Sequence, residues 1–252
     1  QAFNGGTTVN FTWTKQSIDW LEQASKVTPY YQDLAKLCRP FLLQSDSLID
    51  IGCGTGNFSL AFASYVKRVT AVDINPLAIE ILKQKCQGLN LENIYPRESD
   101  WKDISEKSSF EIVFISYVNG LASGQLNKLA SLSSRLIIGV LPKYGREKSF
   151  GLENYITATN EKNSSRDTFS KAISYLQNRG IPFQAKEFSC DFGQPFASMQ
   201  EYQSFLNFYF DIKASDIPTE YTEKYLQKTS QGYYLPNVKE CGIIIIRKED
   251  VK

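Results

Sequence analysis

A short apolar segment that runs directly into three alternating glycines constrains the fold most. Residues 47–51, Ser-Leu-Ile-Asp-Ile, have the composition of a buried strand, and Gly52, Gly54 and Gly56 follow at once. Residues 57–66 then carry apolar side chains at helical spacing. Glycine adopts positive φ without steric cost and lets a ligand approach the backbone without meeting a Cβ. The segment therefore predicts a ligand-binding turn between a strand and a helix.

The alternation of strands and helices continues as far as residue 140. Strand–helix–strand units are right-handed and build a parallel sheet that helices cover on both faces. We therefore expect an α/β fold with a Rossmann-like sheet. Its further helices are predicted at 76–86 and 125–132. Its further strands are predicted at 68–73, 93–97, 110–116 and 135–140.

The rest of the chain is expected to complete one domain, residues 1–252. Helical spacing from 14 to 38, broken at Thr28-Pro29, predicts an N-terminal helical cap within residues 1–40. The sheet core is assigned to 46–190 and 236–250, with late strands at 184–190 and 240–248. Between them, the aromatic-rich residues 191–235 predict a helical insertion with helices at 199–210 and 220–228.

Composition excludes several classes of function. The chain of 252 residues has 28 Lys and Arg against 27 Asp and Glu, so it offers no strong field to nucleic acid. It has no histidine, which excludes a histidine base, a Ser-His-Asp triad and His-containing metal sites. Five scattered cysteines predict free thiols in a reducing compartment, the cytoplasm. We expect no metal, no clear nucleic-acid partner and no membrane segment, and the sequence carries no signal for an oligomeric state.

Two carboxylates accompany the glycine turn. Asp73 ends the strand after the turn, where a carboxylate can bind both hydroxyls of a ribose. Asp50 stands two residues before Gly52, where it would repel a pyrophosphate but suits the ammonium of an amino-acid moiety. The glycine spacing also differs from the G-x-G-x-x-G of dinucleotide sites. The pattern favours S-adenosylmethionine over NAD as the cofactor.

These segments resemble the motifs of the class I S-adenosylmethionine-dependent methyltransferases. Residues 50–56, Asp-Ile-Gly-Cys-Gly-Thr-Gly, match the first motif position for position, and 69–76 look like the second. Residues 98–101, Glu-Ser-Asp-Trp, resemble the third, and 110–116 match the fourth strand, whose end faces the transferred methyl group. The resemblance covers residues 13–140 and is to bacterial and archaeal small-domain members of unknown substrate.

The resemblance implies a mostly parallel sheet with an antiparallel last strand, an N-terminal helical cap and a late insertion. It implies that Asp73 binds ribose, that Ile74 packs on adenine and that Asp100 meets the adenine amino group. Cys53 lies beside the cofactor by motif position, and the small size of its side chain is enough to explain a cysteine at this position. The implied cofactor-binding residues are Asp50, Gly52, Cys53, Gly54, Gly56, Asp73, Ile74, Asp100, Trp101 and Ser116.

The binding site of the methyl acceptor is expected at the end of the fourth strand. Tyr117 is the candidate catalytic residue that touches the reacting atom, with simple burial at a strand end as the alternative. Trp13, Tyr30 and Tyr31 of the cap, together with Asn119, are candidates for the substrate pocket, with core packing as the alternative for the cap aromatics.

The predicted reaction is direct in-line methyl transfer to a small molecule. Without histidine, any base would be a carboxylate, a tyrosine or a lysine, and an already ionised nucleophile fits more easily. The residues 116–119, Ser-Tyr-Val-Asn, are not the Asn-Pro-Pro-Tyr of many DNA and protein amide methyltransferases, which argues against base- or glutamine-nitrogen chemistry of that type. Two alternatives remain open. One is an RNA or protein methyltransferase, although the positive run within 143–171 is interleaved with acidic residues. The other is a non-catalytic scaffold with the methyltransferase fold.

Overall fold

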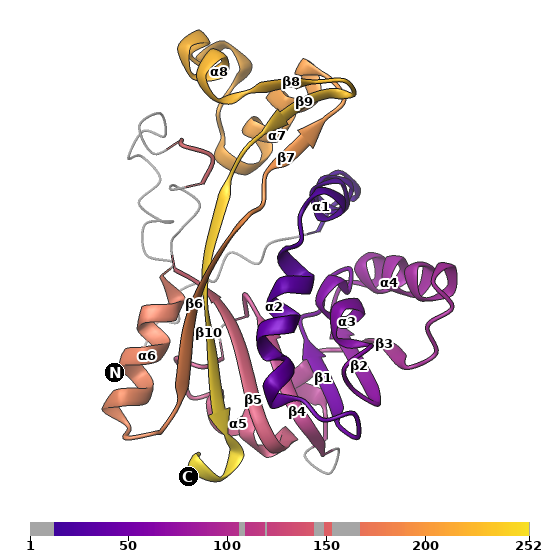
Figure 1. Ribbon diagram of the computed structural model, residues 1–252, viewed down its shortest axis with the longest axis vertical. Helices are drawn as coiled ribbons and strands as arrows, with labels where there is room; N and C mark the ends of the chain where they lie inside the picture. The colour runs from indigo at the N-terminus through magenta and orange to yellow at the C-terminus, as the bar shows by residue number, and fades with distance from the viewer. Residues whose placement is uncertain (1–12, 106–108, 119, 144–148, 153–166, 252) are drawn as a thin grey trace, which may run out of the picture.

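A seven-stranded sheet forms the centre of the molecule (Figure 1). The computed structural model describes residues 13–105, 109–118, 120–143, 149–152 and 167–251. The strand order is β3-β2-β1-β4-β5-β10-β6, and β10 runs opposite to the other six strands. The strands are β1 (Ser47–Ile51), β2 (Arg68–Asp73), β3 (Ile94–Glu98), β4 (Phe110–Ser116), β5 (Ser133–Pro142), β6 (Gln184–Asp191) and β10 (Val238–Arg247). The predicted mostly parallel sheet with an antiparallel last strand is confirmed.

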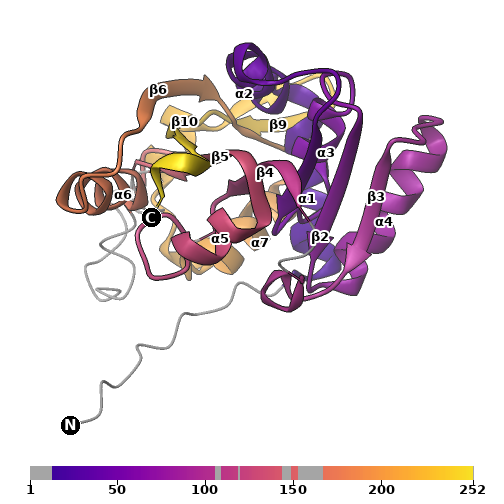
Figure 2. The same cartoon turned by 90° about the horizontal axis from the view of Figure 1, so that it is seen from below.

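Helices cover both faces of the sheet (Figure 2). Side chains that alternate along a strand point to opposite faces, so Leu48 packs in one core cluster and Ile49 in the other. One face is covered by α2 (Tyr30–Cys38), α3 (Asn57–Phe62) and α4 (Pro76–Gly88), and the other by α5 (Leu126–Leu132) and α6 (Thr168–Asn178).

The N-terminal helical segment breaks where the sequence predicts. Helix α1 (Lys15–Val27) begins with a capping box in which Thr14 and Ser17 satisfy each other's backbone amides. It ends before Pro29, and α2 begins at Tyr30. In the part of the chain that the structure describes, none of the helices is both long enough and apolar enough to span a membrane.

Residues 194–235 form a small layer above one end of the main sheet (Figure 1). Its helix α7 (Met199–Phe210) has the predicted bounds, and α8 (Thr219–Tyr225) is shorter than predicted. The strands β7 (Gln194–Phe196), β8 (Gln227–Thr229) and β9 (Gly232–Leu235) were not predicted, and they pair as an antiparallel sheet. Gly232 makes this hairpin possible, because its φ is 135° and a Cβ there would meet the Phe196 carbonyl.

The small layer has its own apolar core, and α1 is docked on it. Trp20 of α1 packs edge-on against Phe205 with ring centroids 5.3 Å apart. Its indole nitrogen donates to the Glu201 carboxylate at 3.2 Å. The N-terminal helix therefore bridges the small layer and the glycine turn of the main sheet.

Candidate active site

The turn after β1 has the conformation that only glycine adopts easily. Gly52, Gly54 and Gly56 have φ values of +70°, +54° and +78°. A Cβ on Gly52 would lie 2.6 Å from Val118 Cγ2, and one on Gly56 would overlap the Leu82 side chain. Close packing and positive φ together explain the three glycines. We call residues 52–56 the glycine loop.

Asp73 faces this loop and not bulk water. Its Oδ2 accepts a hydrogen bond from the backbone amide of Gly54 at 2.8 Å, and its Oδ1 accepts one from that of Asn75 at 2.9 Å. The residue exposes only 9% of its surface. The parallel pairing of β1 with β2 brings the ends of both strands to the same edge of the sheet, which places this carboxylate against the loop.

Asp50 is a buried carboxylate with one unsatisfied oxygen. Its Oδ2 accepts a hydrogen bond from the Ser59 hydroxyl at 2.6 Å, whereas Oδ1 has no partner among the described residues. Burial raises the pKa of Asp50 to about 7; the Asp73 carboxylate adds to this rise, and the Ser59 hydrogen bond opposes it. A buried acceptor without a donor is costly, so this oxygen suits a cationic ligand group.

The residues predicted to contact adenine lie in contrasting environments. Ile74, directly after Asp73, exposes 63% of its surface and offers an apolar face beside the loop. Asp100 is exposed, and its Oδ1 accepts a hydrogen bond from the Lys102 amide at 2.9 Å. Trp101 is buried in the core cluster that contains Ile49. Ile74 and Asp100 are therefore open to a ligand, whereas Trp101 packs in the core on one face of the sheet.

Cys53 and Ser116, the two smaller residues predicted to contact the cofactor, lie in the glycine loop and at the end of the neighbouring strand β4. Cys53 is partly buried, and its burial, together with the carboxylates of Asp50 and Asp73, raises the pKa of its thiol well above the ordinary value. The thiol is thus protonated at neutral pH and is not a nucleophile. Ser116 ends β4 opposite Val140.

Tyr117 and Tyr30 meet through their hydroxyl groups. The two oxygens are 2.7 Å apart. Tyr117 follows β4 with a φ of +57°, an uncommon conformation for a residue with a side chain. It exposes 42% of its surface, although its hydroxyl end meets the fully buried Tyr30. Burial raises the pKa of both phenols well above 10, so both are neutral hydrogen-bonding groups at physiological pH.

Of the other predicted pocket residues, Tyr31 packs edge-on against Tyr30 of this pair, with ring centroids 5.2 Å apart. Trp13 lies over the glycine loop, where a Cβ on Gly54 would be 3.4 Å from its ring. Tyr31 packs edge-on against Phe58 at 4.9 Å, and burial raises its pKa to about 12. Asn119 lies outside the described residues.

Sequence reasoning missed Lys239. Its Nζ lies 4.3 Å from the ring centroid of Phe192, 4.5 Å from that of Tyr117 and 4.7 Å from that of Tyr30. A signal for it exists, because residues 239, 241, 243 and 245 share one face of β10, and the last three are buried. That alternation directs a charged residue toward the core side of the sheet.

An ion pair joins α1 to the glycine loop and was also missed. Glu22 pairs with Lys85 of α4 at 2.6 Å and accepts a hydrogen bond from the Thr55 hydroxyl at 2.6 Å. Lys85 Nζ also donates to the Thr55 carbonyl at 3.1 Å and to Asn57 Oδ1 at 2.9 Å. This network holds the N-terminal helix against the loop.

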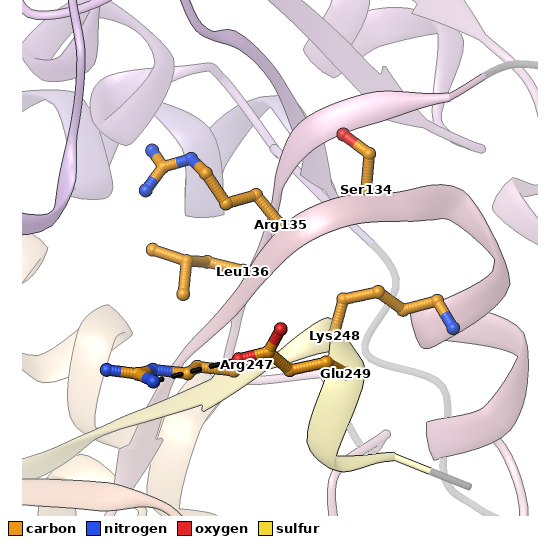
Figure 3. A pocket seen from close by; sticks show the side chains of 6 residues that line it. All are labelled: Ser134, Arg135, Leu136, Arg247, Lys248 and Glu249. Atoms are coloured by element: carbon orange, nitrogen blue, oxygen red, sulfur yellow. Dashed lines mark ion pairs between the residues drawn. The ribbon is translucent and has the colours of Figure 1, made fainter.

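A separate pocket of about 320 Å³ lies where β5 begins and β10 ends, away from the glycine loop (Figure 3). Two of its cations are already paired, Arg135 with Asp46 and Arg247 with Glu249. No group of three or more possible metal-ligating residues occurs within the described parts of the chain.

Comparison with known proteins finds a methyltransferase-domain match within the sheet core. A family model described as a methyltransferase domain matches residues 48–136, which span β1 to the start of β5. Over these residues the chain is similar to a methyltransferase domain. The matched residues include the glycine loop, Asp73 and the end of β4, which are the elements that the structure brings together.

Individual relatives match only in part. The probable cobalt-precorrin-6B C(15)-methyltransferase (decarboxylating) of Methanobrevibacter smithii is 45% identical over 47 residues, 19% of this chain and 25% of that protein. Other relatives are named as RNA methyltransferases. The chain spans between 14% and 40% of the length of these curated relatives.

Two solved structures share the fold. A Bacillus halodurans protein named as a methyltransferase has a TM-score of 0.54 and 18% identity, over 86% of this chain and 98% of that one. The magnesium protoporphyrin IX methyltransferase of Synechocystis, solved with bound S-adenosylhomocysteine, has a TM-score of 0.52 and 15% identity, over 94% and 89%.

Proposed function

We propose that the protein transfers a methyl group from S-adenosylmethionine to a small-molecule acceptor. The observation that carries the proposal is the pair of acids at the glycine loop. Asp73 is held against Gly54, and there it would bind the ribose hydroxyls. Asp50 keeps a buried oxygen unpartnered among the described residues, and this oxygen suits the ammonium of the cofactor's amino-acid end. Ile74, exposed beside Asp73, would pack on adenine.

The chain's main task in such a reaction is alignment. The cofactor, when bound, supplies a methyl group that its sulfonium makes electrophilic. Holding the acceptor in line with that group and excluding water can contribute several orders of magnitude in rate. Tyr117, between the glycine loop and Tyr30, is our candidate for contact with the acceptor. Because its phenol is neutral, it would orient the acceptor through a hydrogen bond and would not act as a base.

A small molecule is favoured over RNA by charge and by the surroundings of Tyr117. The net charge is +1, which gives little attraction to a phosphate backbone. Aromatic rings pack around the ring of Tyr30, the partner of Tyr117, and include Phe58 and Phe192. All five cysteines are free thiols, which supports our proposal that the protein works in the cytoplasm.

Transfer of label from methyl-labelled S-adenosylmethionine tests the proposal. The acceptors would be a panel of phenols, thiols and carboxylates, with total RNA in a parallel reaction. We expect label on a small molecule and loss of transfer in Asp73→Ala, with the exposed Asp19→Ala as control. Label on RNA would favour the RNA alternative, and cofactor binding without transfer to any acceptor would favour the scaffold.

A further inference from the structure

Lys239 lies in a cage of three aromatic rings that come from distant parts of the chain. Tyr30 belongs to α2, Tyr117 follows β4, and Phe192 follows β6. Their ring centroids are 4.3 to 4.7 Å from Nζ. Tyr30 and Phe192 also pack edge to face at 5.2 Å. The ammonium group therefore has a fixed position.

In the described part of the chain, this ammonium is without an ion-pair partner. Among the described residues, no carboxylate forms an ion pair with Lys239. Cation–π contacts recover only part of the free energy that desolvation of an ammonium costs. Burial accordingly lowers the pKa of Lys239 to about 8, against a smaller opposing effect of Cys241. At neutral pH the residue still carries its charge, which an anionic ligand would stabilise.

The cage is next to the glycine loop. Val118, the neighbour of Tyr117, lies against Gly52. Tyr30 packs on Phe58, which follows the loop at the start of α3. Because β10 is antiparallel, Lys239 near its beginning lies at the edge where the parallel strands end. Among the described residues, the same edge thus carries an acid with one unsatisfied oxygen, Asp50, and a cation without an ion-pair partner, Lys239.

Resting on the proposed function, we propose that Lys239 binds the methyl acceptor and that the acceptor is a small molecule with a carboxylate next to an apolar body. The carboxylate pairs with Nζ, and the apolar body packs on Tyr117, which exposes 42% of its surface. Asp50 and Lys239 would therefore bind different ligands. Asp50 takes the cationic end of the cofactor, and Lys239 takes the anionic end of the acceptor.

The test uses protein saturated with S-adenosylhomocysteine and titrated calorimetrically with benzoate, with benzyl alcohol as the uncharged analogue. We expect benzoate to bind more tightly than benzyl alcohol. Lys239→Met keeps the length of the side chain and removes the charge, and it should weaken benzoate binding at least tenfold while binding of benzyl alcohol stays unchanged. The control is Lys36→Met, at an exposed lysine on α2 that pairs with Asp33.

The pH dependence gives an independent readout. Benzoate affinity should fall as the pH rises through about 8, because Lys239 loses its proton there. Among the described residues, the other titratable groups at the cage include Tyr30, Tyr117 and Cys241, Tyr31, which packs on Tyr30 and Phe192 and whose pKa is about 12, and Cys190, which is opposite Lys239 in the pairing of β6 with β10. The pKa of each is raised, chiefly by burial, so they stay neutral over this range.

The failures of the two proposals are distinguishable. Absence of S-adenosylhomocysteine binding would contradict the proposed function. Binding of S-adenosylhomocysteine with no preference for benzoate over benzyl alcohol in the unmodified protein would overturn only the role of Lys239. Equal benzoate affinity in Lys239→Met would overturn it as well. The comparison of the two probes needs no variant, so it holds even if the variant folds poorly.

Discussion

The carboxylate of Asp73 accepts a hydrogen bond from the backbone amide of Gly54, 2.8 Å away. An acid at the end of β2 is thereby joined to the turn that follows β1. A carboxylate has about four acceptor positions, and the amides of Gly54 and Asn75 use two of them. The acid can therefore order the glycine loop and still accept the two hydroxyls of a ribose.

Removal of the Asp73 carboxylate should weaken cofactor binding. Hydrogen bonds to a charged group contribute roughly 1.5–3 kcal/mol, so Asp73→Ala should lower the affinity for S-adenosylmethionine by about one to two orders of magnitude. Calorimetric titration measures this, with Asp19→Ala on the surface of α1 as the control. Equal affinities in Asp73→Ala and the parent protein would show that the ribose assignment is wrong.

Alanine at Gly56 should destabilise the fold. Its φ is +78°, and a Cβ would overlap Leu82. Strain and overpacking together should lower the free energy of unfolding by on the order of 2–4 kcal/mol, as measured by urea denaturation. Gly88→Ala is the matched control, because nothing lies within 4 Å of a Cβ there and alanine favours a helix. A Gly56→Ala protein as stable as its parent would contradict the described loop conformation.

Asp50 should make stability depend on pH. Its pKa is about 7 in the folded protein against an ordinary 3.8, so the folded state binds more protons between these values. The free energy of unfolding should therefore fall as the pH rises from about 4 to about 7, by up to about 4 kcal/mol, and then level off. Asp50→Asn removes this dependence. Denaturation of both proteins at pH 5 and pH 8 measures it, and parallel profiles would argue against a buried, ionisable Asp50.

The ion pair between Glu22 and Lys85 should stabilise the docking of α1. Both side chains are largely buried, and Glu22→Gln leaves the Lys85 ammonium without its counter-charge. We expect a loss of roughly 1–3 kcal/mol in the free energy of unfolding. The exposed pair of Lys15 and Asp19 supplies the comparison, since Asp19→Asn should change stability by less than about 1 kcal/mol. Similar effects of both substitutions would show that α1 does not depend on the buried pair.

The sheet core was predictable because its signals are local. The bounds of β1, β2 and β4 agree with the sequence prediction, since buried parallel strands are continuous apolar runs. The positions of Asp50 and Asp73 followed from the strand ends. The hairpin of β8 and β9 was missed because 220–228 has helical spacing, while the small sheet depends on pairing with the distant β7.

The proposed binding site of the methyl acceptor was less predictable, because the residues that contact one another there are far apart in the sequence. Tyr30 and Tyr117 are 87 positions apart, and their contact depends on how α2 packs over the end of β4. Lys239 is one charged residue near the start of a strand, and only the assembled sheet brings it to these rings. Local secondary-structure propensity carries no information about such long-range contacts.

Titration of the unmodified protein with S-adenosylmethionine tests the central claim most directly. The account predicts binding of one cofactor per chain, with a dissociation constant below about 1 mM, the upper end of common substrate affinities. The absence of binding heat at millimolar cofactor, in protein that unfolds cooperatively, would contradict the assignment of the glycine loop and its two acids.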